Sequence, residues 1–317
     1  MQAIVVEHLG EEGSLREIPV PQPGPDEILV RVTAAGVNPV DWKIRDGARK
    51  PLPFVLGQDF AGVVSAAGAN VNAYKQGDRI FGIARKHGAY AQFTLVPQNS
   101  HGEPIAHIPA DVGDADAAAL PTAGLTALAA LDMMQLHEGQ TLVIFGVTGG
   151  VGSFAAQIAK SRGARVIGTS HSGHENDARE LGVDDFIAYD KQPPVDAVKR
   201  FLPDGADAVL DVVDDGTTIQ SIQSIIRPGG WIISTIGALD VERFKKQGFR
   251  ASNIVMNETP ESSHDGLRQL ARMVEQGTVR VVIAAERDLR EAAQALQQSK
   301  SGGITGKLVL TVESGTI

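Results

Sequence analysis

The sequence of 317 residues contains no cysteine. This absence excludes disulfide bonds, thiolate metal sites and a cysteine nucleophile together. The sequence also lacks an apolar run of about 18 residues, the length that a membrane-spanning helix needs. Basic residues are not in excess, because the chain has 29 Lys and Arg and 38 Asp and Glu, which give a net charge of -9. We therefore expect neither a membrane nor nucleic acid as a partner.

The first seven residues have no basic region ahead of an apolar stretch, so they are typical of a strand rather than of a signal peptide. We expect a cytoplasmic protein. Apolar residues make up 43% of the chain and charged residues 21%, which are globular values. The length favours two domains of ordinary size.

The two parts of the chain differ in pattern. Up to about residue 117, short apolar segments alternate with Gly and Pro turns, which predicts a β-rich fold. After that point, apolar strands alternate with helical stretches, which is typical of a doubly wound parallel sheet. The predicted strands are residues 141–145, 165–170, 185–189, 207–212, 231–236 and 252–256. A strand at 306–312 has no place in that sheet, so we expect the C-terminal segment to return to the first domain.

A glycine-rich turn, GVTGGVG, occupies residues 146–152 between a predicted strand and a predicted helix. A pyrophosphate needs backbone N–H groups at a helix N-terminus with no Cβ in the way, and glycines provide this approach. The strand before the turn and the helix after it are the context that supports a dinucleotide site. The coenzyme contacts expected here are Thr148, Gly149, Gly150 and Val151.

The end of the second strand decides the type of coenzyme. An NAD site places Asp or Glu there, against the ribose 2′-OH. This chain instead has Ser170, His171 and Ser172, and the first acid is Glu175. Hydroxyl groups and His171 can accommodate a 2′-phosphate, which favours NADPH, although His171 also suits an exposed loop.

Several motifs occur in the order seen in one known family. They are AGVNPVDWK (35–43), LGQDFAGVV (56–64), QGDRIFG (76–82), GAYA (88–91), LPTAGLTA (120–127), the glycine turn and GKLVL (306–310). With these motifs the chain resembles the medium-chain dehydrogenase/reductase superfamily, in its zinc-independent quinone oxidoreductase and enone reductase branch. The resemblance implies an α/β protein with a GroES-like β-rich catalytic domain, residues 1–120 with 258–317 returning to it, and a Rossmann NADP(H)-binding domain, residues 121–257.

The zinc-binding branch of the family has Cys where this chain has Asn38 and His where it has Gln58, together with a four-Cys lobe that is missing here. We therefore predict no metal site. Without a Lewis acid on the substrate, the expected chemistry moves from alcohol oxidation to reduction of an activated double bond or a quinone.

Hydride delivery to such a substrate builds negative charge on an oxygen, which a positioned donor stabilises. The resemblance places Asn38, Asp41 and Lys43 beside the nicotinamide, as candidate catalytic residues. Asn38 and Lys43 are the candidate donors, and Asp41 is expected to fix the loop. Alternatively, Asn38 makes a turn before Pro39 and Lys43 is simply solvated.

Further coenzyme contacts are expected from strand ends and from family positions. They are Thr126, Tyr189, Val212, Val213, Ile236, Gly237 and Lys307. A packed strand-end tyrosine and a surface lysine are the alternatives for Tyr189 and Lys307.

The sequence thus predicts an enzyme that uses NADPH to reduce quinones or α,β-unsaturated carbonyl compounds. The alternative is an NADP(H)-binding regulatory or structural protein with little turnover. The family implies a homodimer formed at the edge of the Rossmann sheet, with 252–256 a possible edge strand.

Overall fold

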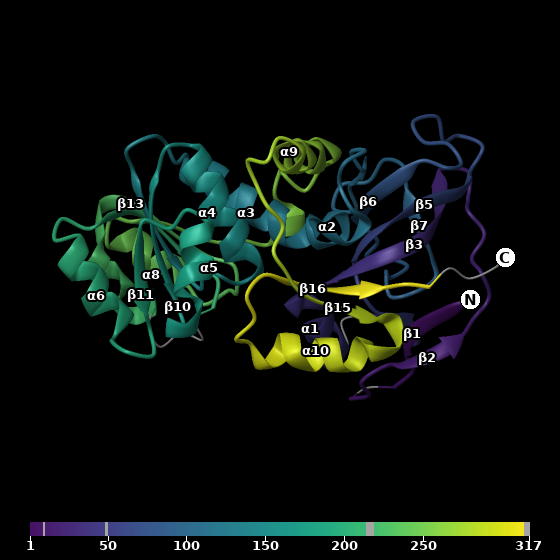
Figure 1. Cartoon of the computed structure of the whole chain (residues 1–317), viewed down its shortest axis with the longest axis horizontal. Helices are drawn as coiled ribbons and strands as arrows, with labels where there is room; N and C mark the ends of the chain where they lie inside the picture. Colours follow the sequence, from purple (N-terminus) through teal and green to yellow (C-terminus); the bar gives the residue numbers. More distant parts are fainter. Residues whose placement is uncertain (9, 48–49, 214–218, 314–317) are drawn as a thin grey trace. The chain divides into compact units, whose positions relative to one another are not determined.

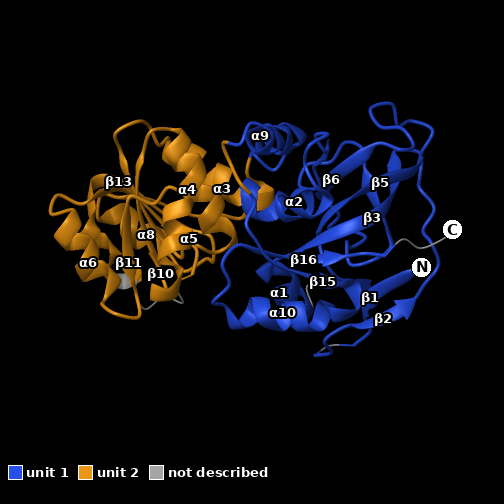
Figure 2. Ribbon diagram, in the orientation of Figure 1, with its two compact units in different colours: residues 1–125, 260–277, 281–317 blue, residues 126–259, 278–280 orange. Residues whose placement is uncertain are grey.

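The computed structural model describes residues 1–8, 10–47, 50–213 and 219–313. The chain divides into two compact units (Figure 2). The first comprises Met1–Leu125, Pro260–Gly277 and Val281–Ile317, and the second comprises Thr126–Thr259 and Thr278–Arg280. In the described part of the chain, no helix combines the length and the apolar character that crossing a membrane requires.

The first unit is built on a seven-stranded mixed sheet with the order β15-β16-β3-β5-β6-β8, in which β7 also pairs with β3. Its strands are β3 (Glu27–Val37), β5 (Asp59–Ala67), β6 (Arg79–Ile83), β7 (Phe93–Pro97), β8 (Ile105–His107), β15 (Ile283–Asp288) and β16 (Lys307–Thr311). A smaller sheet has the order β2-β1-β4, from β1 (Gln2–Val6), β2 (Ser14–Glu17) and β4 (Phe54–Val55). Its helices are α1 (Pro39–Gly47), α2 (Asp114–Ala119), α9 (His264–Glu275) and α10 (Ala292–Ser301), with a 3-10 turn η4 (Leu289–Glu291).

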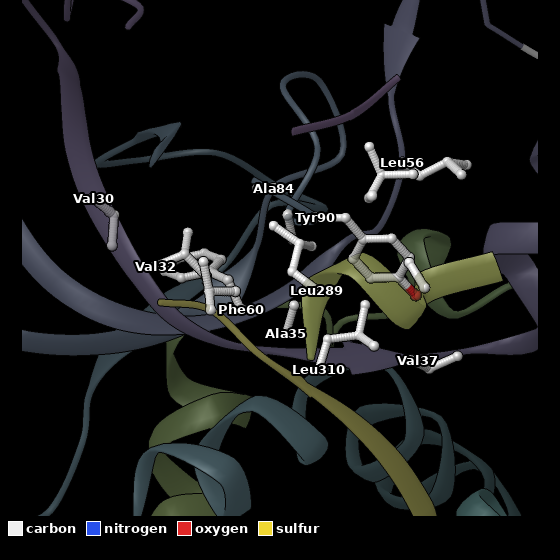
Figure 3. Packing of buried hydrophobic residues seen from close by; sticks show 14 of the residues in the cluster. Val30, Val32, Ala35, Val37, Leu56, Phe60, Ala84, Tyr90, Leu289 and Leu310 are labelled. Atoms are coloured by element: carbon white, nitrogen blue, oxygen red, sulfur yellow. The ribbon is translucent and has the colours of Figure 1, made fainter. Parts of the chain in front are cut away.

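The C-terminal strand β16 pairs antiparallel with β3, Leu308 opposite Val37 and Thr311 opposite Ala34 (Figure 1). This pairing places the C-terminal strand in the main sheet of the first unit. Apolar side chains from β3, β5, β16 and η4 fill the core of the unit, among them Val32, Phe60, Leu289 and Leu310 (Figure 3).

The second unit is a six-stranded parallel sheet with the order β11-β10-β9-β12-β13-β14. Its strands are β9 (Thr141–Phe145), β10 (Arg165–Ser170), β11 (Asp185–Ala188), β12 (Ala206–Asp211), β13 (Ile226–Ser234) and β14 (Arg250–Asn253). Its helices are α4 (Gly150–Ser161), α5 (Glu175–Glu180), α6 (Pro194–Phe201), α7 (Ile219–Ile222) and α8 (Val241–Lys246), with 3-10 turns η1 (Ser172–His174), η2 (Gln223–Ile225) and η3 (Met256–Glu258). Helix α3 (Pro121–Met134) begins before the unit boundary and ends after it.

The strand order is that of a doubly wound dinucleotide-binding sheet, in which the direction of winding reverses between β9 and β12. The predicted α/β fold class is confirmed. The predicted strand 252–256 is shifted, because β14 pairs with β13 from Arg250 to Asn253 and Met256 already lies in the 3-10 turn. The strand ends at Asn253, whose side chain bonds to the backbone of Leu239.

Candidate functional site

The glycine turn lies at the carboxyl edge of the parallel sheet, where strand β9 ends. Gly146 adopts φ +85°, a conformation that favours glycine, and so turns the chain out of the strand. The N–H of Val147 then donates to the carbonyl of Thr169 on β10 at 3.0 Å. Gly149 is the N-cap of α4, and no side chain caps the helix there. The first N–H groups of α4 are therefore available to an anion.

Two glycines of the turn have different structural demands. A Cβ on Gly152 would lie 2.2 Å from the carbonyl oxygen of Gly146, so glycine is needed for α4 to begin this close to the turn. A Cβ on Gly149 would meet a single atom, the Gly146 oxygen at 3.4 Å. Gly149 thus keeps the outer face of the turn open, and this cradle fits the pyrophosphate of a dinucleotide.

Polar side chains gather at the end of β10, next to the turn. Thr148 and Ser170 are both buried, and their hydroxyl oxygens are 2.7 Å apart. His171 is half-exposed and accepts a hydrogen bond on Nδ1 from the N–H of Gly173. These hydroxyl groups and the imidazole thus lie at the end of β10, as candidates for the coenzyme site.

The structure adds a carboxylate to this cluster that sequence reasoning missed. Asp190 follows strand β11 and accepts hydrogen bonds from the N–H of Ser172 at 2.7 Å and from its hydroxyl at 2.8 Å. Partial burial acts to raise the pKa of Asp190, but these bonds outweigh it and hold the pKa well below its usual range. Because β10 and β11 are parallel neighbours, the end of β11 lies beside the end of β10. Asp190 lies 20 residues beyond Ser170 in the sequence and reaches the cluster only through the pairing of β10 with β11.

The remaining predicted coenzyme contacts in this unit follow the ends of the neighbouring strands. Tyr189 is 52% exposed, and its N–H donates to the carbonyl of Ser170. Val212 and Val213 follow β12, and a Cβ on Gly146 would touch both. Ile236 and Gly237 follow β13, and Thr126 lies buried in α3.

The first unit buries a polar cluster around Asn38, at the junction of β3 and α1. The Asn38 N–H donates to Asp41 Oδ2 at 2.9 Å, which caps the start of α1 from within its first turn. The hydroxyl of Tyr90 donates to the same oxygen at 2.8 Å. Asp41 is 1% exposed, and its second oxygen has no partner among the described residues. Asp41 therefore joins the start of α1 to Tyr90 through hydrogen bonds.

The Asn38 side chain is held from both ends. Its amide nitrogen donates to Asp59 Oδ2 at 2.8 Å, and its amide oxygen accepts from the Lys307 ammonium group. Lys307 also donates to the carbonyl of Val37 at 2.8 Å. Asp59 accepts two further bonds from the N–H and the hydroxyl of Thr122. Lys307 is thus a buried cation of this cluster.

Burial controls the charge state of these groups. Burial, aided by the nearby charge of Asp59, raises the pKa of Asp41 to about 7, although hydrogen bonds from Asn38 and Tyr90 act to lower it. Burial also raises the pKa of Asp59, against the effect of Lys307, and lowers the pKa of Lys307. Burial raises the pKa of Tyr90 well above its usual value.

Lys43 lies outside this cluster. It is exposed on α1, with its ammonium 5.5 Å from the ring centre of Trp42. Gln58 is buried, and its amide oxygen accepts from Arg85 Nε at 3.1 Å. Within the described ranges, no three His, Cys, Asp or Glu side chains come together as a metal site.

Sequence reasoning missed several groups that the fold brings to this site: Asp59, Tyr90, Arg85 and Lys50. Asp59 follows Gln58 inside a motif that had been singled out, so its position was a usable signal. Tyr90 lies in the motif GAYA (88–91), which was a signal of the same kind, whereas Arg85 and Lys50 lie outside these motifs and offered no local signal.

Two family models match the chain. Residues 24–109 match an alcohol dehydrogenase GroES-like domain, and residues 181–310 match a zinc-binding dehydrogenase domain.

Relatives match over nearly the whole chain. A quinone oxidoreductase of Rattus norvegicus is 30% identical over 98% of this chain and 97% of its own length. A 2-methylene-furan-3-one reductase of Solanum lycopersicum is 31% identical over 92% of this chain and 74% of its own length. Among solved structures, quinone oxidoreductase of Escherichia coli in complex with NADPH has a TM-score of 0.89 and 25% identity, covering 98% of this chain and 100% of that one.

Proposed function

The chain belongs to the quinone oxidoreductase branch of the medium-chain dehydrogenase/reductase superfamily, and from that premise we propose that it is a zinc-independent NADPH-dependent reductase of quinones or α,β-unsaturated carbonyl compounds. The observation that carries the proposal is the open glycine turn at the uncapped start of α4. Residues 121–257 are the proposed coenzyme-binding domain, and residues 1–120 with 258–317 the proposed catalytic domain.

The residues of the second unit would hold the coenzyme. The N–H groups at the start of α4 bind the pyrophosphate, with Thr148, Gly149, Gly150 and Val151 around it. The hydroxyl groups of Ser170 and Ser172, with His171, face the adenosine ribose. Tyr189, Val212, Val213, Ile236, Gly237 and Thr126 are the other proposed contacts. When bound, NADPH supplies a hydride to the substrate, and water supplies the balancing proton.

The residues of the first unit orient the substrate. The side chain of Asn38 is held by Asp59 and Lys307. One hydrogen of its amide nitrogen is bonded to Asp59, and the other keeps a fixed direction in which it can donate to the substrate. Lys307 therefore acts as a positioning residue in this proposal rather than as a coenzyme contact, and Asp41 positions the start of α1 through the Asn38 N–H. The exposed Lys43 has a smaller part than the sequence suggested.

Zinc independence is supported by the donor set at the two positions that carry ligands in the zinc-binding branch. Asn38 and Gln58 are neutral amides, which are poor zinc ligands. Their amide oxygens are already bound by cationic side chains, those of Lys307 and Arg85. Metal analysis of the purified protein, with activity measured after chelation, tests this point, and a stoichiometric zinc whose removal abolishes activity would contradict it.

NADPH consumption tests the activity. We expect turnover with benzoquinone or cyclohexenone and none with a simple aldehyde, and NADPH should be preferred over NADH. Binding of NADPH without turnover on any member of the panel would instead favour the alternative, a coenzyme-binding protein. One observation favours that alternative, since Asn38 is only 2% exposed and one of its two amide hydrogens is already bonded to Asp59.

We further propose a cytoplasmic homodimer. Strand β14 is the last strand at one edge of the six-stranded sheet, which is the position that an edge-to-edge dimer needs. Light scattering gives the mass in solution, and a monomer would contradict the dimer. Cell fractionation tests the location.

A further inference from the structure

Two cationic side chains lie together beside Gln58, in the first unit. The ammonium of Lys50 donates to the backbone carbonyl of Arg85, and Arg85 Nε donates to the Gln58 amide oxygen at 3.1 Å. Both side chains are half-buried. The positive charge of Arg85 is close enough to lower the pKa of Lys50, so the two cations share one region next to the buried amide of Gln58.

Neither cation has a carboxylate partner at ion-pair distance among the residues described. Burial lowers the pKa of both groups, and the positive charge of Arg85 lowers that of Lys50 further. Asp41 and Glu103 oppose this effect on Lys50 only through longer-range attraction. Unpaired, partly buried like charges are costly, so their presence in a small region indicates a use for positive charge there.

The surroundings suit an organic anion. Lys50 lies 5.6 Å from the ring centre of Phe54, and both line a shallow depression with Asp41, Ile44 and Gln58. The depression has no room for a water molecule, so a ligand would bind outside it, beside Lys50. Arg85 does not line the depression and adjoins it through Gln58. Asp41 is protonated below about pH 7 and then adds no negative charge.

We propose that Lys50 and Arg85 form a subsite for a negatively charged oxygen of the substrate, either a carboxylate that it carries or the enolate oxygen that forms on reduction. The inference rests on the proposed reductase function. It assigns to Lys50 and Arg85 the role of positive donor that the sequence had suggested for Lys43. Charge-assisted hydrogen bonds from these groups are the stabilising interaction.

Calorimetric titration of the full chain with benzoate and with neutral benzamide tests the subsite. Benzoate should bind more tightly than benzamide, and Lys50→Gln and Arg85→Gln should each weaken benzoate about tenfold while leaving benzamide unchanged. Lys86→Gln is the matched control, because Lys86 is adjacent in sequence but is 68% exposed and pairs with Glu27. Lys50→Arg keeps the charge and should keep the affinity.

Equal binding of benzoate and benzamide by the unmodified protein overturns the proposal, and so does an equal loss in Lys86→Gln. The comparison of the two ligands is made on the unmodified protein. It therefore decides the proposal even if a variant does not fold.

Kinetics with acetylacrylate, an enone that carries a carboxylate, and with its methyl ester separates the two sources of negative charge. A rise in KM for the acid alone, in Lys50→Gln, identifies the substrate carboxylate. A fall in kcat for both compounds identifies the enolate oxygen. Unchanged kinetics with both compounds refutes the link to the reaction. Charge-selective benzoate binding in a protein without turnover would refute the reductase function and leave the anion subsite standing.

Discussion

The buried ammonium of Lys307, near the end of the chain, donates a hydrogen bond to the side-chain oxygen of Asn38, which lies 269 residues earlier. The same asparagine donates to Asp59, so its amide links a buried cation to a buried carboxylate. In this arrangement the charges of Lys307 and Asp59 compensate each other without a direct ion pair being needed. The start of α1 is thereby tied to strand β16.

Replacing Lys307 by Met should destabilise the protein strongly. The change leaves Asp59 as a buried charge without its cation and removes the hydrogen bond that Lys307 donates to the Val37 carbonyl. A loss of about 3 kcal/mol in the free energy of unfolding is expected, measured by urea denaturation. Lys75→Met, at an exposed position of the same unit, should change it by no more than about 0.5 kcal/mol. Equal effects of the two variants would show that the buried cation does not stabilise the cluster.

Asp41 should make stability depend on pH. Its pKa is about 7 in the folded chain against an ordinary value of 3.8, so the folded state binds more protons between these values. The free energy of unfolding should therefore fall as pH rises from about 4 to about 7. The fall should be at most about 1.4 kcal/mol for each unit of difference between the two pKa values. Above about pH 7 the contribution of Asp41 to the free energy of unfolding should no longer change with pH.

Asp41→Asn, which cannot titrate, provides the comparison. Chemical denaturation of both proteins over the pH range should give a shallower slope for the variant. Parallel curves would mean that Asp41 is ionised in the folded protein throughout.

Alanine variants of Gly149 and Gly152 should distinguish the effect of the turn on stability from its effect on coenzyme binding. Gly152→Ala forces a contact with the Gly146 carbonyl and should destabilise the protein by about 1–3 kcal/mol. Gly149→Ala has room for its methyl group, so thermal stability should be kept while the affinity for NADPH falls about tenfold or more. Calorimetry and thermal melting measure the two effects. Unchanged NADPH affinity in Gly149→Ala would argue against the pyrophosphate at this turn.

Asp190 should reduce the preference for NADPH. Its carboxylate holds the N–H and the hydroxyl of Ser172, two donors that a 2′-phosphate could otherwise use, and it repels a phosphate placed nearby. Asp190→Asn should therefore lower the Kd of NADPH several-fold and leave that of NADH nearly unchanged. Asp204→Asn, an exposed position in the same unit, controls for net charge. If both coenzymes respond alike, Asp190 does not act at the ribose.

Local patterns were enough to predict the architecture. The glycine turn, the apolar strands before and after it and the alternation of strands with helices are properties of short segments, so they can be recognised without knowing which segments meet. The predicted strands 141–145 and 165–170 match β9 and β10 residue for residue. Strand β14 was misplaced because its limits depend on the pairing with β13 rather than on its own composition.

The sequence by itself determined that this protein has a doubly wound sheet with a dinucleotide-type turn, and that no thiolate metal site can form. Only the tertiary structure decided which polar groups share a site. It brings Tyr90 to Asp41, Lys307 to Asn38, Arg85 to Gln58 and Asp190 to Ser172. The physical reason is that hydrogen bonding and burial act over a few ångströms in space, whereas these partners are separated by 18 to 269 residues along the chain.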